Sequence, residues 1–184
     1  MEPVDFAQVL DAARAGEEWA ISAIYRDLHP RLAGYFRAQE PRAADDLEAE
    51  VWLAFAERLH AFTGDADALR AWMFSIARRR LADHRRTAVR RRTDVVPIEQ
   101  LDGPAPEDPA ALVLDGLAAD EAARFVVGVL PAAQAEVILL RVLADLSVDE
   151  VAEILGKRPG TVRVLSHRAL RTLESRLTGK SVTR

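Results

Sequence analysis

Apolar residues recur every three or four positions along most of this chain, which is the spacing of one face of an α-helix. The first such stripe runs over residues 6–13, the second over 21–28, the third over 47–55 and the fourth over 69–81. Pro30 is expected to end the second helix, because proline lacks the backbone N–H that a helix interior uses. No alternation of period two extends far enough for a strand, so the sequence predicts an all-α fold.

A segment rich in proline and acidic residues interrupts the helical pattern. Residues 94–109 contain four prolines and five acidic side chains, a composition that favours an extended linker. Helical spacing resumes over 112–129, and Pro131 is placed to open a further helix that reaches about Asp145. The chain is therefore predicted to form two small helical domains, residues 1–93 and 110–184, joined by an acidic, proline-rich linker over 94–109.

Residues 147–173 have the pattern of a helix-turn-helix. Ser147 and Glu150 are spaced as a capping box, in which each side chain bonds the backbone N–H of the other residue. Gly156 has the position of a C-terminal glycine, and a second helix follows with Thr161 as its expected cap. A short helix packed across a second, arginine-rich helix is the arrangement that places side chains in the major groove of DNA.

The second helix of this motif has two distinct faces. Val162, Leu165, Ala169 and Leu173 share one side and are expected to pack inward. On the other side, arginine could bond a guanine bidentately and a small apolar group could contact a thymine methyl. An ordinary helical hairpin with solvated arginines would share part of this pattern. The outward residues predicted to contact DNA are Thr161, Arg163, Val164, His167, Arg168 and Arg171.

Composition narrows the class of protein. The chain has 184 residues and no cysteine, and it is 49% hydrophobic and 29% charged. These values are typical of a folded globular protein, and they exclude disulfides and cysteine zinc sites. The apolar runs are too short to cross a bilayer, and the N-terminus lacks the layout of a signal peptide. We therefore expect a cytoplasmic protein with no membrane insertion.

The net charge of −4 conceals a strong segregation of charge along the chain. Residues 70–92 carry nine basic side chains against one acidic side chain, and residues 94–121 carry eight acidic side chains and no basic one. The last thirty residues carry eight basic side chains against Glu174 alone. Two basic regions separated by an acidic one indicate two contacts with a polyanion. Solvated arginine-rich surfaces would give the same numbers, so charge alone does not decide the function.

Two groups of motifs, in the right order along the chain, carry a resemblance to a known family. The motifs of the N-terminal half are Ala44-Asp45-Asp46-Leu47, Glu50-Val51-Trp52-Leu53, Trp72-Met73 and Ile76-Ala77-Arg78. The motifs of the C-terminal half are Leu130-Pro131, Leu146-Ser147, Glu150-Val151-Ala152, Leu155-Gly156 and Gly160-Thr161-Val162-Arg163. With these residues the chain resembles the extracytoplasmic-function (ECF) sigma factors of bacterial RNA polymerase, in the sigma-70 family. Its two domains are similar to sigma region 2 and to the helix-turn-helix of sigma region 4.

The chain also departs from the family pattern. Ala49 stands where the family often has glutamine, and Arg79 stands where it often has asparagine. In the recognition helix, Val164 and Leu165 replace a common polar-basic pair, and Ser166 replaces a usual leucine. These differences bear on which promoter is read and leave the class unchanged.

The resemblance implies an alternative sigma factor that binds core RNA polymerase and directs promoter recognition, under the control of an anti-sigma factor. The helices similar to region 2 would dock on the polymerase through an acidic helix with apolar anchors, although Trp52 could equally pack in the domain core. In free protein, acidic segments of the same chain could fold over its basic faces. The residues implied in polymerase binding are Asp45, Asp46, Glu50, Trp52 and Leu53.

Two further contacts with promoter DNA are implied. The helix from Leu69 to about Arg92 would face the start-proximal element, where arginines neutralise phosphates. The loop from His60 to Ala68, which includes the turn Thr63-Gly64-Asp65, would capture an unstacked base on Phe62 unless that ring belongs to the core. The recognition helix would read the farther element. The residues implied at the start-proximal element are Phe62, Arg78, Arg79, Arg80, Arg85 and Arg86.

Two other classes of function were weighed against this interpretation. A stand-alone helix-turn-helix regulator that binds an operator would explain the C-terminal half and leave the N-terminal motifs unexplained. A metal-dependent nuclease could use Asp45, Asp46 and Glu50, but no second acidic cluster accompanies them, and the four histidines have no metal-ligand spacing. We therefore expect no enzymatic activity, no cofactor, no metal site and no small-molecule substrate.

Overall fold

The computed structural model describes residues 6–93 and 115–180, and every regular element within these two ranges is a helix. The all-α prediction is confirmed, and the expected linker over 94–109 lies outside the described residues. The N-terminal elements are α1 (Phe6–Arg14), α2 (Glu18–Gln39), α3 (Ala44–Arg58), the 3-10 helix η1 (Leu59–Ala61) and α4 (Ala66–Thr93). The C-terminal elements are α5 (Asp115–Val129), α6 (Ala132–Val142), α7 (Val148–Leu155) and α8 (Pro159–Lys180).

Helix α2 continues through Pro30, so the expectation that this proline ends the helix is wrong. A proline inside a helix costs about 3 kcal/mol. The turns that follow bury Leu32, Tyr35 and Phe36 completely, and each large apolar side chain contributes about 1.5–3 kcal/mol on burial. The helix continues because the side chains beyond the proline are held in the core, which the local sequence does not reveal.

The N-terminal helices pack around an aromatic centre. The ring of Tyr35 meets Phe36 at 5.5 Å and Phe74 at 5.6 Å between centroids, both edge to face. None of these three rings is exposed, and burial raises the pKa of the Tyr35 phenol to about 12. These rings join α2 to α4, which helps to set the positions of the charged side chains on the outer faces of both helices.

The helix-turn-helix forms as predicted at its first helix. Glu150 N–H donates to Ser147 Oγ at 3.2 Å, and Ser147 N–H donates to Glu150 Oε2 at 2.6 Å, which completes the capping box before α7. Gly156 follows α7 with φ of +61°, a left-handed conformation that favours glycine. The expectation that Thr161 caps the second helix is wrong: α8 already begins at Pro159, and Val162 N–H donates to the carbonyl of Arg158.

Helix α6 ends at Val142, three residues before the expected end at about Asp145. Asp145 has φ of +53° in the left-handed region, a conformation that a continuing right-handed helix does not contain. The turn after Val142 leads the chain into the capping box at Ser147 and so orients α7 relative to α6.

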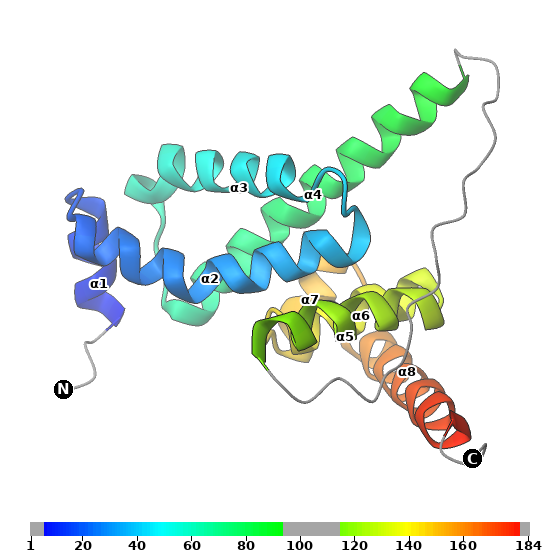
Figure 1. Cartoon of the computed structure of the whole chain (residues 1–184). Helices are drawn as coiled ribbons and strands as arrows, with labels where there is room; N and C mark the ends of the chain where they lie inside the picture. The colour runs from blue at the N-terminus through cyan, green and yellow to red at the C-terminus, as the bar shows by residue number, and fades with distance from the viewer. Residues whose placement is uncertain (1–5, 94–114, 181–184) are drawn as a thin grey trace.

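The two groups of helices are docked on each other. Helix α5 packs along α2, and α7 packs on α4 (Figure 1). Buried residues from both halves, including Leu32 and Phe74 from one and Val137 and Val151 from the other, belong to one continuous core. Gly34 permits the close approach of α5 to α2, because a Cβ there would lie 3.3 Å from Asp120 Oδ1 and 3.7 Å from a Leu143 methyl.

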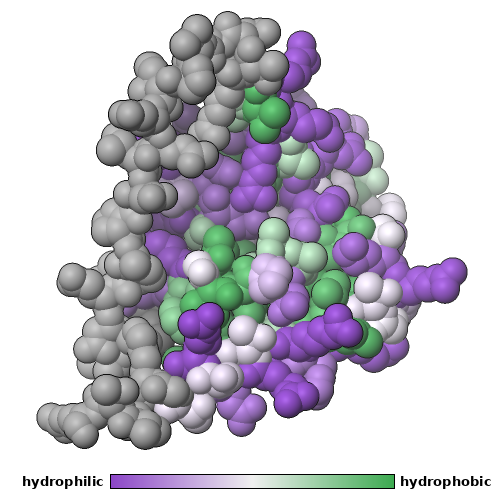
Figure 2. Space-filling view, turned by 90° about the vertical axis from the view of Figure 1, so that its right-hand side faces the viewer, coloured by the Kyte–Doolittle hydropathy of each residue, from purple (hydrophilic) through white to green (hydrophobic). Residues whose placement is uncertain are grey.

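The surface is mixed in polarity. Figure 2 looks onto the right-hand side of the view in Figure 1 and shows hydrophobic side chains lying among hydrophilic ones. Several large apolar side chains remain exposed, among them Tyr25 and Leu53 in the N-terminal half and Val164 and Leu170 in α8. Within the described ranges, no helix is long and apolar enough to cross a membrane.

Candidate polymerase and nucleic-acid interfaces

Helix α3 presents the predicted acidic surface. Asp45 and Asp46 occupy its first turn, where the helix dipole favours negative charge, and both are exposed together with Glu50 one turn later. Leu53 is 62% exposed, which is unusual for a leucine on a helix that also builds the core. The structure therefore brings three carboxylates and an apolar side chain together on one solvent-facing helix.

Trp52 lies at the edge of this surface and not in the interior. Its ring is half-buried against the core, within 5.6 Å of the Phe55 centroid. Its indole Nε1–H donates to Glu48 Oε1 at 3.0 Å. The indole therefore contributes to packing and is also partly accessible at the surface, and its contact with polymerase stays a prediction.

Glu48 is a residue that the sequence analysis missed. It is 6% exposed, the one buried charged residue within the described part of the chain. Its Oε1 accepts from Trp52 and also lies 2.5 Å from His29 Nδ1. A sequence signal was available: Glu48 falls on the same helical face as Ala44, Leu47 and Val51, all of which are buried. A carboxylate on a core face needs a hydrogen-bonding partner.

The basic surface of α4 is already engaged by acidic residues of the same chain. Arg80 Nε lies 3.4 Å from Glu50 Oε2, and Arg85 Nε lies 2.8 Å from Glu40 Oε1. Arg86 pairs with Asp83 of its own helix. Arg79 is exposed and forms no ion pair with another described residue. These arginines lie on one long helix, but most of them would have to exchange a carboxylate for a phosphate to bind DNA.

Arg78 makes a contact between the two domains. Its Nε donates to Glu136 Oε1 of α6 at 2.9 Å, and both side chains are partly buried. Three other arginines of the N-terminal half also reach the C-terminal half: Arg37 pairs with Asp120 at 2.9 Å, and Arg31 and Arg70 donate to the carbonyls of Leu143 and Asp145. The hydrogen bond to Asp120 raises the pKa of Arg37, which keeps its charge fixed.

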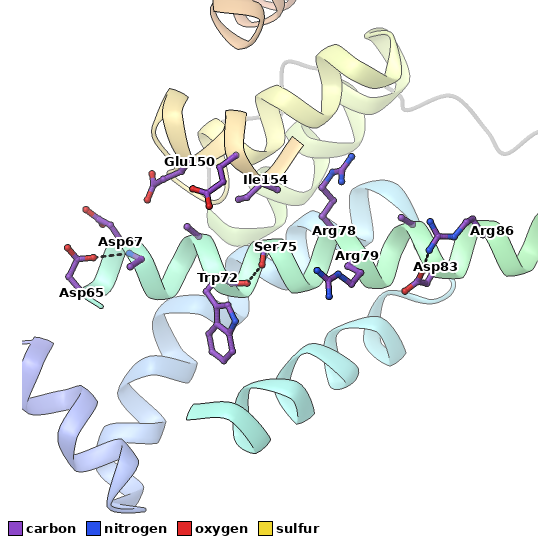
Figure 3. A pocket seen from close by; sticks show the side chains of 14 residues that line it. Asp65, Asp67, Trp72, Ser75, Arg78, Arg79, Asp83, Arg86, Glu150 and Ile154 are labelled. Carbon is purple, nitrogen blue, oxygen red and sulfur yellow. Dashed lines mark hydrogen bonds and ion pairs between the residues drawn. The ribbon is translucent and has the colours of Figure 1, made fainter. Parts of the chain in front are cut away.

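A groove of about 950 Å³ is lined by residues of α4 and α7 (Figure 3). Asp65, Asp67 and Glu150 line one part of it, and Arg79 and Arg86 line another. In Figure 3, Glu150 extends from α7 toward α4, whereas Trp72 points away from α7 toward α3. The groove therefore brings carboxylates of α7 together with both acidic and basic side chains at and along α4.

The loop between η1 and α4 is held in a defined conformation. Asp65 caps α4 by accepting the N–H of Ala68 at 2.8 Å. Phe62 is half-buried, and its ring stacks on Trp72 with centroids 5.3 Å apart and planes inclined by 28°. The carbonyl of Phe62 accepts a hydrogen bond from Arg14 of α1. The Phe62 ring thus packs on the core and remains partly accessible, and its capture of a base stays a prediction.

The recognition helix α8 has the predicted division into two faces. Val162 and Ala169 are fully buried, and Leu165 and Leu173 are half-buried against the cores. The side chain of Ser166 is also half-buried. The outward residues Thr161, Arg163, Val164, His167, Arg168 and Arg171 are all exposed.

No group of three or more histidine or acidic side chains within the described ranges is arranged to hold a metal ion. The carboxylates of Asp45, Asp46 and Glu50 point from an exposed helix surface and do not converge with ligands of another element. The nuclease alternative therefore gains no support from the geometry.

Comparison with known proteins agrees with this two-domain arrangement. Residues 24–91 match the family Sigma-70 region 2, and residues 114–173 match Sigma-70, region 4. The fold is similar to that of RpoE in its co-crystal structure with the anti-sigma factor NepR from Bartonella quintana, with a TM-score of 0.62 and 22% identity over 89% of this chain and 97% of that one. The protein thus has the two helical domains of a sigma-70-type factor.

Two curated relatives place it more narrowly. The chain is 31% identical over 180 residues to the ECF RNA polymerase sigma factor SigD of Mycobacterium tuberculosis, a match that covers 92% of this chain and 82% of SigD. It is 33% identical over 172 residues to the ECF RNA polymerase sigma factor BldN of Streptomyces coelicolor, which covers 90% of this chain and 63% of BldN. The chain belongs to the ECF sigma factors, which are regulators of transcription initiation.

Proposed function

We propose that this protein is a cytoplasmic, non-enzymatic sigma factor that binds core RNA polymerase and directs it to a set of promoters. The observation that carries the proposal is the two-faced recognition helix of a region 4 domain, accompanied in the same chain by a region 2 domain. A stand-alone regulator that binds an operator would not require the region 2 domain.

The polymerase contact is proposed on α3. Asp45, Asp46 and Glu50 form an acidic border, and Leu53 together with the accessible edge of Trp52 provides apolar contact. This combination fits a partner surface with basic side chains around an apolar patch. Steering by the carboxylates would make association faster at low salt, and the apolar contact would slow dissociation.

The start-proximal DNA contact is proposed on α4 and the loop before it. Arg78, Arg79, Arg80, Arg85 and Arg86 would neutralise phosphates, which supplies affinity without sequence information. Phe62 would accept an unstacked base on the part of its ring that Trp72 leaves accessible, because base–aromatic stacking stabilises an opened strand.

The farther promoter element would be read by α8. Arg163, Arg168 and Arg171 can bond guanine edges or phosphates, and Val164 can contact a thymine methyl. The exposed Val164 stands where a polar or basic side chain is common in the family, so the protein would read a different base at the corresponding position.

The docked arrangement of the domains is proposed to oppose promoter binding in the free protein. It engages Arg78 with Glu136 and places Glu150 and Glu153 of α7 in the groove along α4. Phosphates approaching that groove would meet these negative charges. RpoE, the structural relative, was solved with an anti-sigma factor, and an anti-sigma factor is likewise proposed to control this chain, by stabilising the docked form.

The proposal can be tested by reconstituted transcription on a pool of genomic promoter fragments, with core RNA polymerase and with or without this protein. Discrete new transcript starts that share two spaced upstream motifs are expected. Absence of both new starts and binding to core polymerase would contradict the proposal, and tight independent binding to an operator would then favour the regulator.

A further inference from the structure

A buried carboxylate organises an aromatic group between α2 and α3. Glu48 Oε1 accepts the indole N–H of Trp52 at 3.0 Å and lies 2.5 Å from His29 Nδ1, which donates when the carboxylate is ionised. The Tyr25 ring stacks on the His29 imidazole with centroids 4.7 Å apart and planes inclined by 10°. It also contacts the Trp52 indole at 4.8 Å. Glu48 thus contacts two of the rings directly, and the Tyr25 ring packs on both of them.

This aromatic group forms one wall of a surface hollow of about 450 Å³. The hollow is lined mainly by apolar side chains, including Ile21 and Tyr25 of α2 and Trp52 and Phe55 of α3. Tyr25 is 42% exposed and Ile21 39% exposed, so the lining faces solvent. An accessible apolar concavity of this kind typically marks a contact with another molecule.

We propose that Glu48 is a positioning residue: it holds the Tyr25 and Trp52 rings as the preformed wall of a hollow into which core RNA polymerase inserts an apolar side chain. The inference rests on the proposed function, and it adds to the acidic face of α3 a second contact that includes α2.

Polymerase is the occupant that the surroundings favour. Trp52 belongs both to the hollow and to the α3 surface proposed to bind polymerase, so the two are continuous. Arg14 and His60 also line the hollow, and the exposed carboxylates of Glu17, Glu18 and Glu57 follow the lining residues Gly16 and Ala56. An apolar side chain would match the lining, and a partner surface with charges of both signs would match its border.

The stability of the fold does not by itself explain why position 48 carries a carboxylate. A buried ion costs free energy on desolvation, and an apolar residue of similar volume usually gives equal or greater stability. An apolar residue at position 48 could not accept the indole N–H. This hydrogen bond fixes the rotation of the Trp52 side chain. Preorganised aromatic side chains bind with a smaller loss of conformational entropy.

The test is a binding assay between the full chain and core RNA polymerase, with variants Glu48→Ala, Glu48→Gln, Trp52→Ala and the double variant Glu48→Ala/Trp52→Ala. Loss of one hydrogen bond that positions a contact predicts about tenfold weaker binding for Glu48→Ala. The double variant should lose less affinity than the sum of the two single losses, because Glu48 acts in part through the indole. Glu48→Gln keeps an oxygen acceptor and should restore most of the affinity.

A matched control is Glu121→Ala, which removes an exposed glutamate from α5 and should leave polymerase binding unchanged. Thermal unfolding of each variant shows whether the fold is retained. If Glu48→Ala does not fold, Tyr25→Ala removes the exposed ring instead and should also weaken binding.

The outcomes separate this inference from the proposed function. A wild-type chain that does not bind core polymerase contradicts the proposed function itself. A wild-type chain that binds, with a folded Glu48→Ala variant of equal affinity, overturns the role of Glu48 alone. Additive losses in the double variant, or a Glu48→Gln variant as weak as Glu48→Ala, would also overturn it, since neither fits an acceptor acting on Trp52.

Discussion

The contacts between the two domains can be weakened without changing either helical core. Asp120→Asn and Glu136→Gln each remove a charge and keep the size of the side chain. They break the ion pairs with Arg37 and Arg78, whose atoms lie 2.9 Å apart in both cases. All four side chains retain partial exposure, between 19% and 45%, so solvent screens the pairs without eliminating them.

The expected effect follows from this partial exposure. Exposed ion pairs contribute up to about 1 kcal/mol each, and these two, being half-buried, fall near that limit. Losing both would destabilise the docked form by about 2 kcal/mol, a shift of roughly 30-fold in the equilibrium between docked and separated domains. DNA binding by the free protein should strengthen as well, because Arg78 is released from Glu136.

The assay is energy transfer between dyes on the two domains. The chain has no cysteine, so Ala49→Cys on α3 and Leu170→Cys on α8 give a unique pair of attachment points, both exposed. The double charge variant should show lower transfer than the parent at low salt, and the parent should approach it as salt is raised. Glu121→Gln, which removes an exposed charge of α5 outside these pairs, is the control.

A steric variant tests the same interface with its charges intact. Gly34→Leu would drive a side chain into Asp120 and Leu143, which a Cβ at this position already approaches within 3.3 and 3.7 Å. It should also lower the transfer between the dyes. If neither variant changes the energy transfer or the affinity for promoter DNA, the docked arrangement does not oppose DNA binding and the reasoning is refuted.

Three further outcomes are expected. The pKa of Tyr35 is about 12 in the folded chain and about 10 in the unfolded chain, so its contribution to stability is complete below pH 10. Above that pH the unfolded chain ionises first, and the free energy of unfolding falls by about 1.4 kcal/mol at pH 11. The Tyr35→Phe variant should lack this loss in denaturant titrations at alkaline pH. Ser147→Ala removes half of the capping box and should lower the free energy of unfolding by about 1 kcal/mol, as measured by urea titration, whereas Ser175→Ala on the exposed end of α8 should not. Phe62→Ala should slow promoter opening on duplex DNA, which is seen as reduced permanganate reactivity of thymines. The activity of this variant should recover on a premelted template. Opening at the wild-type rate would exclude Phe62 from base capture.

Local patterns predicted much of the fold. Helical spacing of apolar residues located the helices, and the Ser147–Glu150 box with Gly156 located α7, because caps and left-handed glycines act over a few residues. The outward face of α8 was likewise readable from spacing, and each of its predicted residues is exposed. The motifs in both halves also indicated the family before any contact between the halves was known.

Contacts between distant segments could not be predicted in the same way. Pro30 looked like a helix end because its missing N–H is a local property, whereas the burial that carries α2 past it comes from other helices. The role of Glu48 depends on its contacts with Trp52 and with His29, which lies 19 positions away in the sequence. Arg78 was assigned to DNA, and in the docked form it is bound to Glu136, 58 positions along the chain.

By itself the sequence determined the all-helical class, the helix-turn-helix and the ECF sigma family, since each depends on residues a few positions apart. Only the tertiary structure decided which carboxylates meet the arginines of α4 and which acid supports the aromatic surface of α2 and α3. The reason is that the energy of an ion pair or a buried hydrogen bond depends on distance in space and on burial, and both are set by how the helices pack.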